Sequence, residues 1–363
     1  MKKNKKVLYN FWGYLSDRIG ISAPDGNASY SSWIINEFLD RGYEVYRGPI
    51  DRDLEIINKY GLKKSFEGFA QKDRLKAYKR SIPIDINNMP EVDILLLEWR
   101  FPTPYNQCSK RSKKYNPDLE IQEKIINHYK NTNTKIVIMD LDYKLKKSDI
   151  KRVKPDLILE QAYEPKNGVF QSLPIDIKYL KNLKITTKYN KLMSYVGNDY
   201  RRREDIIKKI IPFSKKHEGM VHFYGNWTRK DKKEFTDKYT SISYHGRIGL
   251  SGFKEALGDS VCTPLLAPNT YKNRGFMTPR IFESLVFGSI PIGFDDFNHI
   301  DKFLPKECIV KTSKCSSDIE KKVLKIKSMN KEKKKKLVDK IIKKISKYFS
   351  SKRFVDRIES VLI

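Results

Sequence analysis

The sequence is poor in cysteine and has no long apolar run, and these shortages exclude several classes of protein. Its four cysteines are widely spaced along 363 residues and include no Cys-x-x-Cys pair, so neither a disulfide framework nor a zinc site is expected. No run of about 18 apolar residues occurs, which argues against a transmembrane helix. The basic first residues lack the apolar core and the cleavage site of a signal peptide. We therefore expect free thiols in a reducing cytosol and no stable association with a membrane.

Acidic residues are also scarce relative to basic ones. Lysine and arginine total 73 against 44 aspartates and glutamates, which gives a formal net charge of +29. A surface this basic attracts polyanions, with nucleic acid and anionic membranes as the main candidates. A genome rich in A and T would inflate lysine whatever the function, and this alternative stays open. Hydrophobic residues make up 39% of the chain, enough to build cores, so the chain is expected to fold.

Glycine-rich phosphate motifs are absent too, since the chain has neither a P-loop nor a Gly-x-Gly-x-x-Gly fingerprint. The first half instead alternates short apolar runs with helical patterns. Runs such as Val92–Glu98 are typical of strands buried on both faces of a parallel sheet. Expected strands are Val7–Trp12, Tyr43–Tyr46, Val92–Glu98, Lys135–Asp142 and Leu157–Glu160, and expected helices are Tyr30–Leu39 and Asp118–Tyr129.

The same rhythm restarts after a polar, lysine-rich stretch, Lys178–Lys191. We predict two Rossmann-like, doubly wound α/β domains that face each other across a cleft, the GT-B architecture, with the ligand at the carboxyl ends of the strands. The N-terminal domain is placed at residues 1–180 and the C-terminal domain at 181–330. Expected strands of the second domain are Leu192–Val196, Val221–Tyr224, Ser241–Tyr244, Val261–Leu266 and Ile290–Phe294, and expected helices are Asp205–Phe213, Phe253–Gly258 and Pro279–Phe287.

A basic amphipathic helical segment, 331–363, is expected to end the chain. In Lys331–Phe349, apolar residues such as Leu337, Ile341 and Ile345 share one face, and lysines fill most of the rest. We favour a packed terminal helix with a solvated basic face. A helix that lies on a membrane surface is the alternative.

A helix start near Thr278 carries the strongest candidate site. Thr278 is a good N-cap and Pro279 a good first helical residue. Arg280 then sits in the first turn, where a bound anion would offset its conflict with the helix dipole. Glu283 lies on the same face and can accept hydrogen bonds from both hydroxyls of a ribose. Together Arg280 and Glu283 predict a clamp for a nucleotide diphosphate, with a plain surface ion pair as the alternative.

The segment 193–205, MSYVGNDYRRRED, gathers three arginines at a strand-to-helix turn. Gly197 allows a ligand to approach the backbone closely. Arginines at the carboxyl end of a strand favour a phosphate site, although three adjacent arginines are often only a solvated patch. Weaker signals come from Gly225, in FYGN at 223–226, and from YHGRI at 244–248, where a base or ribose could lie against the backbone.

Asp140 and Asp142 end the buried strand KIVIMDLD. Acids at this edge of a sheet point into the cleft, and transfer of a sugar to a hydroxyl needs a base that takes the acceptor proton. Asp142 is the better candidate because it lies further out. The alternative is a pair of structural or capping acids.

Taken in order, these motifs resemble the DNA β-glucosyltransferases of T-even bacteriophages, which glucosylate 5-hydroxymethylcytosine in duplex DNA. The resemblance covers roughly the whole chain and rests on YVGNDYRRRE, FYGN, Gly-Arg-Ile at 246–248, the Arg-x-x-Glu helix and KIVIMDLD. The Arg-x-x-Glu helix recurs across GT-B enzymes and supports the fold more than the substrate. One departure is Tyr30, which stands where the family has a glutamate near the sugar, and this puts the identity of the sugar in doubt.

The resemblance implies a role for each matching residue. Asp142 would be the general base and Glu283 the ribose ligand, while Tyr271 would reach a phosphate. The donor would be UDP-glucose, and Mg²⁺ or Mn²⁺ would assist the departure of the diphosphate, although no ligand cluster for a metal is visible. The donor site implied by the resemblance comprises Gly197, Arg201, Arg203, Gly225, Arg247, Ile248, Tyr271, Arg280 and Glu283.

The implied acceptor is a hydroxymethylated pyrimidine, 5-hydroxymethylcytosine or 5-hydroxymethyluracil, in duplex DNA. Direct attack would invert the anomeric centre, and the base would have to leave the stack. Basic runs could supply the DNA track, although each is also compatible with a solvated face. The expected DNA contacts are Lys110, Arg111, Lys146, Lys147, Arg229 and Lys230.

Two rival functions remain open. A GT-B enzyme acting on a capsule or lipopolysaccharide-type glycan would keep the donor site, and a non-catalytic DNA-binding protein would keep only the fold. For the DNA enzyme, we expect a monomer in the cytoplasm of an infected bacterial host.

Overall fold

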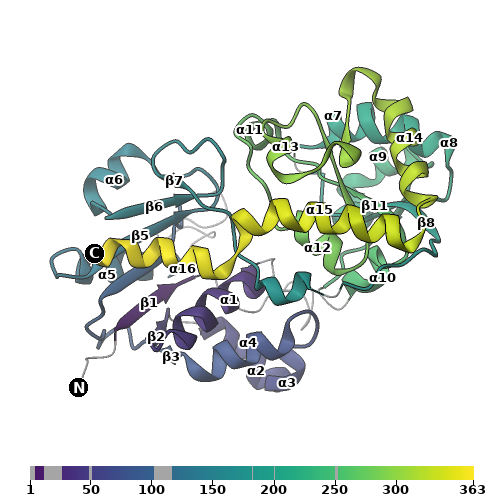
Figure 1. Ribbon diagram of the computed structural model, residues 1–363. Helices are drawn as coiled ribbons and strands as arrows, with labels where there is room; N and C mark the ends of the chain where they lie inside the picture. The colour runs from purple at the N-terminus through teal and green to yellow at the C-terminus, as the bar shows by residue number, and fades with distance from the viewer. Residues whose placement is uncertain are drawn as a thin grey trace.

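Two parallel sheets organise the chain (Figure 1). The computed structural model describes residues 5–11, 27–48, 51–101, 117–181, 183–199, 201–249 and 252–363. Every strand pair in both sheets is parallel. The strand orders are β3-β2-β1-β4-β5-β6-β7 and β10-β9-β8-β11-β12-β13. In each sheet the order of the strands reverses beside the first strand, as in a doubly wound Rossmann fold. This confirms the predicted α/β fold.

The first sheet is buried on both faces because its central strands are almost wholly apolar. In β4, Leu95 and Leu97 face α5 and α6, and Ile94 and Leu96 face α1. The strands are β1 (Lys6–Asn10), β2 (Glu44–Arg47), β3 (Ile82–Pro83), β4 (Ile94–Glu98), β5 (Lys135–Asp140), β6 (Leu157–Glu160) and β7 (Val169–Phe170). The helices are α1 (Asn27–Asp40), α2 (Asp51–Tyr60), α3 (Leu62–Ser65), α4 (Gln71–Arg80), α5 (Pro117–Tyr129) and α6 (Lys147–Val153).

The second sheet follows a short 3₁₀ turn at Ile177–Leu180. Its strands are β8 (Lys191–Val196), β9 (Val221–Tyr224), β10 (Ser243–His245), β11 (Ser260–Pro264), β12 (Ile290–Phe294) and β13 (Ile309–Val310). Around it lie α7 (Arg203–Asp205), α8 (Ile211–Lys216), α9 (Lys233–Lys238), α10 (Phe253–Leu257), α11 (Asn269–Lys272), α12 (Arg280–Val286), α13 (Ile300–Phe303) and α14 (Cys315–Lys327).

Two helix starts differ from the sequence prediction. The helix expected at Asp205–Phe213 is α7 and α8 joined by a π-helical turn at Ile206–Ile210. The predicted Thr278 cap is wrong: α12 begins at Arg280, and Pro279 is its N-cap residue, without a side-chain cap. The proline fixes its own backbone there and leaves Thr278 one residue outside the helix.

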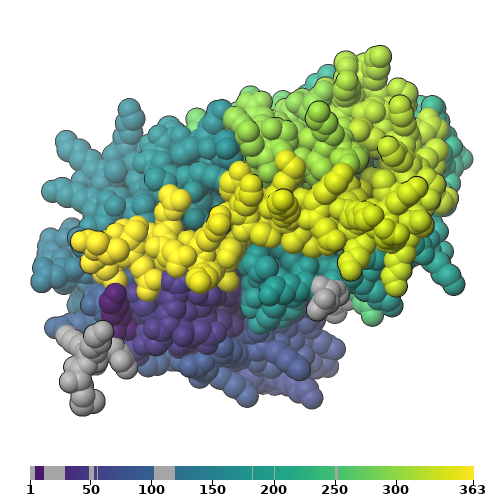
Figure 2. Space-filling model, viewed as in Figure 1, coloured from purple at the N-terminus to yellow at the C-terminus, as the bar shows by residue number. Residues whose placement is uncertain are grey.

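The end of the chain crosses from one sheet to the other. The expected basic helix is α15 (Lys331–Phe349), which buries Leu337, Ile341 and Ile345 against the second half of the chain. The chain then turns into α16 (Ser351–Glu359), which packs against α1 of the first sheet. Figure 2 shows the two helices as one continuous yellow band over both halves. In the part of the chain that the structure describes, no helix is long and apolar enough to cross a membrane.

Candidate active site

The two acidic residues at the end of β5, Asp140 in the strand and Asp142 just beyond it, have different surroundings. Asp140 is 1% exposed, and its carboxylate accepts hydrogen bonds from the backbone N–H groups of Lys144 and Leu145, at 2.9 Å and 3.0 Å. Burial raises the pKa of Asp140 above its ordinary value, against these two hydrogen bonds. Asp140 therefore organises the loop that follows the strand. Asp142 is only partly buried, so of the two acids it is the one placed for chemistry.

Asp142 meets a side chain from the second half of the molecule. The Tyr271 hydroxyl, in α11, donates a hydrogen bond to Asp142 Oδ1 at 2.8 Å. The Tyr271 ring stacks on Phe276, with centroids 4.1 Å apart. Sequence reasoning placed Tyr271 at a phosphate; the structure places its hydroxyl on the predicted base.

Backbone pairing between the two halves supports this contact. Tyr163 N–H donates to Gly275 O, and Glu164 N–H donates to Arg274 O. These bonds attach the loop after α11 to the segment after β6. The loop that carries Phe276 is therefore fixed to the domain that carries Asp142.

The turn after β8 that carries Arg201, Arg202 and Arg203, the arginine turn, lines an open cavity of about 760 Å³, the arginine cavity. Arg201 adopts a left-handed backbone conformation, with φ of 51°. Arg203 Nε lies 2.6 Å from Asp199 Oδ2, and Lys232 Nζ lies 3.0 Å from the same oxygen. Burial alone would raise the pKa of Asp199, but Lys232 and Arg203 outweigh it and hold that pKa below its ordinary value. Lys232, which the sequence analysis did not place in the donor site, thus adds a cation to this cavity.

Arg280 and Glu283 form the predicted pair at the start of α12. Arg280 Nη1 lies 2.9 Å from Glu283 Oε2, although the contact lacks hydrogen-bond geometry. The Arg280 guanidinium also lies over the Phe253 ring, 4.9 Å from its centroid. Burial raises the pKa of Tyr195, and the positive charges of Arg202 and Arg280 oppose this. Arg202 and Arg280 therefore act on the same tyrosine of β8.

The predicted glycines pack against each other. Gly225 has φ of 155°, and a Cβ built on it would lie 2.2 Å from Gly197 O. The same oxygen accepts a hydrogen bond from Trp227 Nε1 at 2.8 Å. Beyond them, Ile248 packs beside Val196 and Phe253, and Arg247 is exposed. The glycines thus join two strand ends, while Ile248 and Arg247 lie at the rim of the same region.

The predicted DNA contacts fall in three places. Lys146 and Lys147 are exposed at the start of α6. Arg229 lines the cavity of Arg201 and Arg203, and Lys230 is exposed next to it. The expected contacts at Lys110 and Arg111 lie outside the described residues.

The described residues provide no metal site made by the protein alone. Among them, no three histidine, cysteine or acidic side chains converge. The acid nearest the arginines, Asp199, is already paired with Arg203 and Lys232. No chemical step is therefore assigned to a protein-held metal.

The fold is that of GT-B glycosyltransferase structures. No family model and no curated protein matches the chain. A T4 phage BGT mutant in complex with UDP-glucose is similar over 98% of this chain and 99% of its own, with a TM-score of 0.61 and 13% identity. An α-glucosyltransferase in complex with UDP and a 13-mer DNA containing an HMU base is similar over 99% of each chain, with a TM-score of 0.59 and 13% identity.

A third similar structure comes from a different kind of pathway. AviGT4, a glycosyltransferase involved in avilamycin A biosynthesis, is similar over 98% of this chain and 96% of its own, with a TM-score of 0.53 and 11% identity. At these identities, the likeness establishes the two-domain architecture alone.

Proposed function

We propose that the protein is a UDP-sugar-dependent glycosyltransferase that moves glucose to the hydroxymethyl group of a modified pyrimidine in duplex DNA. One observation carries the proposal. Asp142, at the carboxyl end of β5, is hydrogen-bonded at 2.8 Å to Tyr271, two residues from Asn269, which lines the arginine cavity. A candidate base of one domain is thus linked to an arginine-lined pocket of the other, an arrangement that suits transfer from a sugar diphosphate.

The donor binds with its nucleotide on the second domain. Arg201, Arg203 and Arg280 offset the charge that grows on the leaving diphosphate, a kind of electrostatic stabilisation worth about 3 kcal/mol per well-placed donor. Glu283 accepts hydrogen bonds from the ribose hydroxyls, in place of its contact with Arg280. Ile248 and the backbone of Arg247 frame the uracil.

Asp142 removes the proton from the acceptor hydroxyl as its oxygen attacks the anomeric carbon. The bond from that carbon to the diphosphate breaks, and UDP leaves with the electron pair. Attack from the face opposite the leaving group inverts the anomeric centre. The α-linked donor therefore gives a β-linked product.

DNA as the acceptor is supported by charge and by fold. The net charge of +29 and the exposed Lys146 and Lys147 suit a polyanion. The similarity to the T4 phage enzyme and to the DNA-bound α-glucosyltransferase extends over nearly the entire chain. A base that reaches the cleft must leave the helical stack, so flipping of the target nucleotide is part of the proposal.

A glycan acceptor is the second candidate, and the similarity to AviGT4 is the observation that favours it. Release of UDP from UDP-glucose tests the two acceptors side by side. We expect duplex DNA with 5-hydroxymethylcytosine or 5-hydroxymethyluracil to stimulate release, and unmodified duplex of the same sequence to have no effect. Stimulation by a capsule-type oligosaccharide alone would overturn the DNA assignment and keep the glycosyltransferase.

A further inference from the structure

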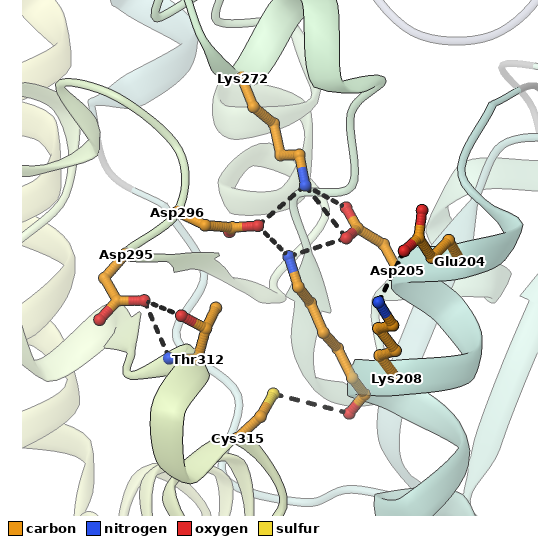
Figure 3. A network of polar contacts seen from close by, with 9 residues as sticks. Glu204, Asp205, Lys208, Lys272, Asp295, Asp296, Thr312 and Cys315 are labelled. Carbon is orange, nitrogen blue, oxygen red and sulfur yellow. Dashed lines mark hydrogen bonds and ion pairs between the residues drawn. The ribbon is translucent and has the colours of Figure 1, made fainter.

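Four charged side chains form a closed ring beside the arginine turn (Figure 3). Lys272 Nζ lies 2.9 Å from Asp205 Oδ2 and 2.8 Å from Asp296 Oδ2. Lys209 Nζ lies 2.9 Å from Asp205 Oδ1 and 2.6 Å from Asp296 Oδ2. Each lysine thus contacts both aspartates, and the charges alternate around the ring.

The two lysines of the ring are largely shielded from water, whereas the side chains of Asp205 and Asp296 are 13% and 33% exposed. The side chains of Lys209 and Lys272 are each 7% exposed. Burial lowers the pKa of Lys272, but Asp296 and Asp205 outweigh it and hold that pKa above its ordinary value. Burial raises the pKa of Asp296, but Lys209 and Lys272 outweigh it and hold that pKa below its ordinary value. Removing either aspartate would leave the buried charges of Lys209 and Lys272 with one partner fewer, so the ring is costly to break.

The members of the ring come from segments that carry the proposed chemistry. Asp205 ends α7, which begins at Arg203 of the arginine turn. Lys209 lies in the π-helical turn that follows, a local distortion often found at functional sites. Lys272 follows Tyr271 directly in α11. The ring therefore connects the helix that begins at Arg203 with the helix that carries Tyr271.

We infer that Tyr271 is a positioning residue for Asp142, and that the ring around Lys272 sets the position of Tyr271 relative to the diphosphate. This inference rests on the proposed function. The hydroxyl of Tyr271 orients the carboxylate of Asp142 from across the cleft, as partners beyond the reacting groups do in many active sites. The donor site and the base are thereby held at a fixed position relative to each other.

The isosteric variant Tyr271→Phe tests the first part and separates it from a phosphate-binding role. Loss of a positioning hydrogen bond lowers kcat about tenfold or more and leaves the dissociation constant of UDP unchanged. A phosphate ligand would do the reverse, weakening UDP binding. Tyr60→Phe, at an exposed tyrosine of α2, is the matched control, and its kcat and dissociation constant for UDP are expected to equal those of the wild type.

A double-mutant cycle tests whether Tyr271 acts through Asp142. In an Asp142→Asn background, Tyr271→Phe is expected to cause no further loss of kcat, because its target is already disabled. A further tenfold loss in that background would overturn the inference.

The ring is tested with Lys272→Met, with Lys302→Met at a half-exposed lysine as its control. Lys272→Met is expected to lower kcat about tenfold, and to do so non-additively with Tyr271→Phe. Additive losses would show that the ring does not act through Tyr271. Wild-type transfer to modified DNA is measured in the same series: if it is absent, the proposed function fails; if it is present and unaffected by Tyr271→Phe, only the inference fails.

Discussion

Gly225 lies so close to Gly197 that a Cβ on residue 225 would be 2.2 Å from the Gly197 carbonyl oxygen. The sequence prediction assigned both glycines to close approach of a ligand. In the structure, Gly225 instead allows two strand ends to pack closely, because the atom nearest to a Cβ at this position belongs to the backbone of Gly197. The arginine turn begins four residues after Gly197, so its position depends on this contact.

Gly225→Ala is therefore expected to destabilise the second domain and to weaken UDP binding as a consequence. The clash and the unfavourable φ of 155° predict a loss of about 1–3 kcal/mol in the free energy of unfolding. Gly246→Ala is the matched control, because a Cβ there would meet only Thr228 Oγ1, at 3.6 Å. Chemical denaturation of both variants measures the difference. Equal stabilities would contradict the packing role.

Substitutions of the two acids at the end of β5 are expected to affect different properties, stability for Asp140 and activity for Asp142. Asp140→Asn disturbs hydrogen bonds to two backbone N–H groups and should lower the free energy of unfolding by about 1–3 kcal/mol. Asp142→Asn should leave that free energy unchanged and lower kcat by about 100-fold or more. Denaturation and UDP release, measured on both variants, check this. A fully active Asp142→Asn enzyme would remove Asp142 as the base.

Lys334 is expected to make stability depend on pH. It is 1% exposed, and burial lowers its pKa from 10.5 to about 8. Between these values the unfolded chain binds more protons than the folded one, so the free energy of unfolding rises as pH increases from about 8 to 10.5, by about 3 kcal/mol.

Lys334→Met should remove this contribution and raise the free energy of unfolding at pH 7 by about 1 kcal/mol, because a buried charge is replaced by an apolar chain of similar length. Lys335→Met, at the exposed neighbour, should retain the pH dependence. Denaturation at pH 7, 8 and 10 distinguishes the two variants. An unchanged pH dependence in Lys334→Met would contradict the assignment.

Lys146 and Lys147 are expected to contact DNA phosphates. The double variant Lys146→Ala/Lys147→Ala should lower the affinity for duplex DNA uniformly across sequences, and should reduce the slope of log affinity against log salt by about 2. The KM for UDP-glucose should stay the same. Lys331→Ala/Lys335→Ala, at exposed positions of α15, serves as the control. Equal slopes of log affinity against log salt in the two double variants would show that DNA phosphates are contacted at other residues.

Local patterns predicted the sheets well, since buried parallel strands are continuous apolar runs and β4, β5, β8 and β12 have that form. The pattern could not predict the π-helical turn, because its apolar spacing resembles that of an ordinary helix. The predicted helical segment 331–363 contains α16, but the pattern did not predict the break at Ser350 or the docking of α16 on α1, which depends on contacts between the two ends of the chain.

The site shows the same division. Residues at strand ends, such as Asp142 and Arg203, were predicted because a parallel sheet brings its carboxyl ends together. The ring was missed because its partners are distant in sequence: Lys272 and Asp205 are 67 residues apart, and Lys209 and Asp296 are 87 apart. The contact of Tyr271 with Asp142 spans 129 residues. The lysines of the ring look like any others in a chain this rich in lysine.

The most direct test of the proposed function is to weigh the nucleosides released from duplex DNA after incubation with the protein and UDP-glucose. The duplexes carry 5-hydroxymethylcytosine or 5-hydroxymethyluracil, and an Asp142→Asn protein is treated in parallel. The proposal predicts one added hexose on a modified pyrimidine with the wild type, and its loss with the variant. Unmodified nucleosides from both duplexes, with UDP released in the presence of a glycan acceptor, would contradict it.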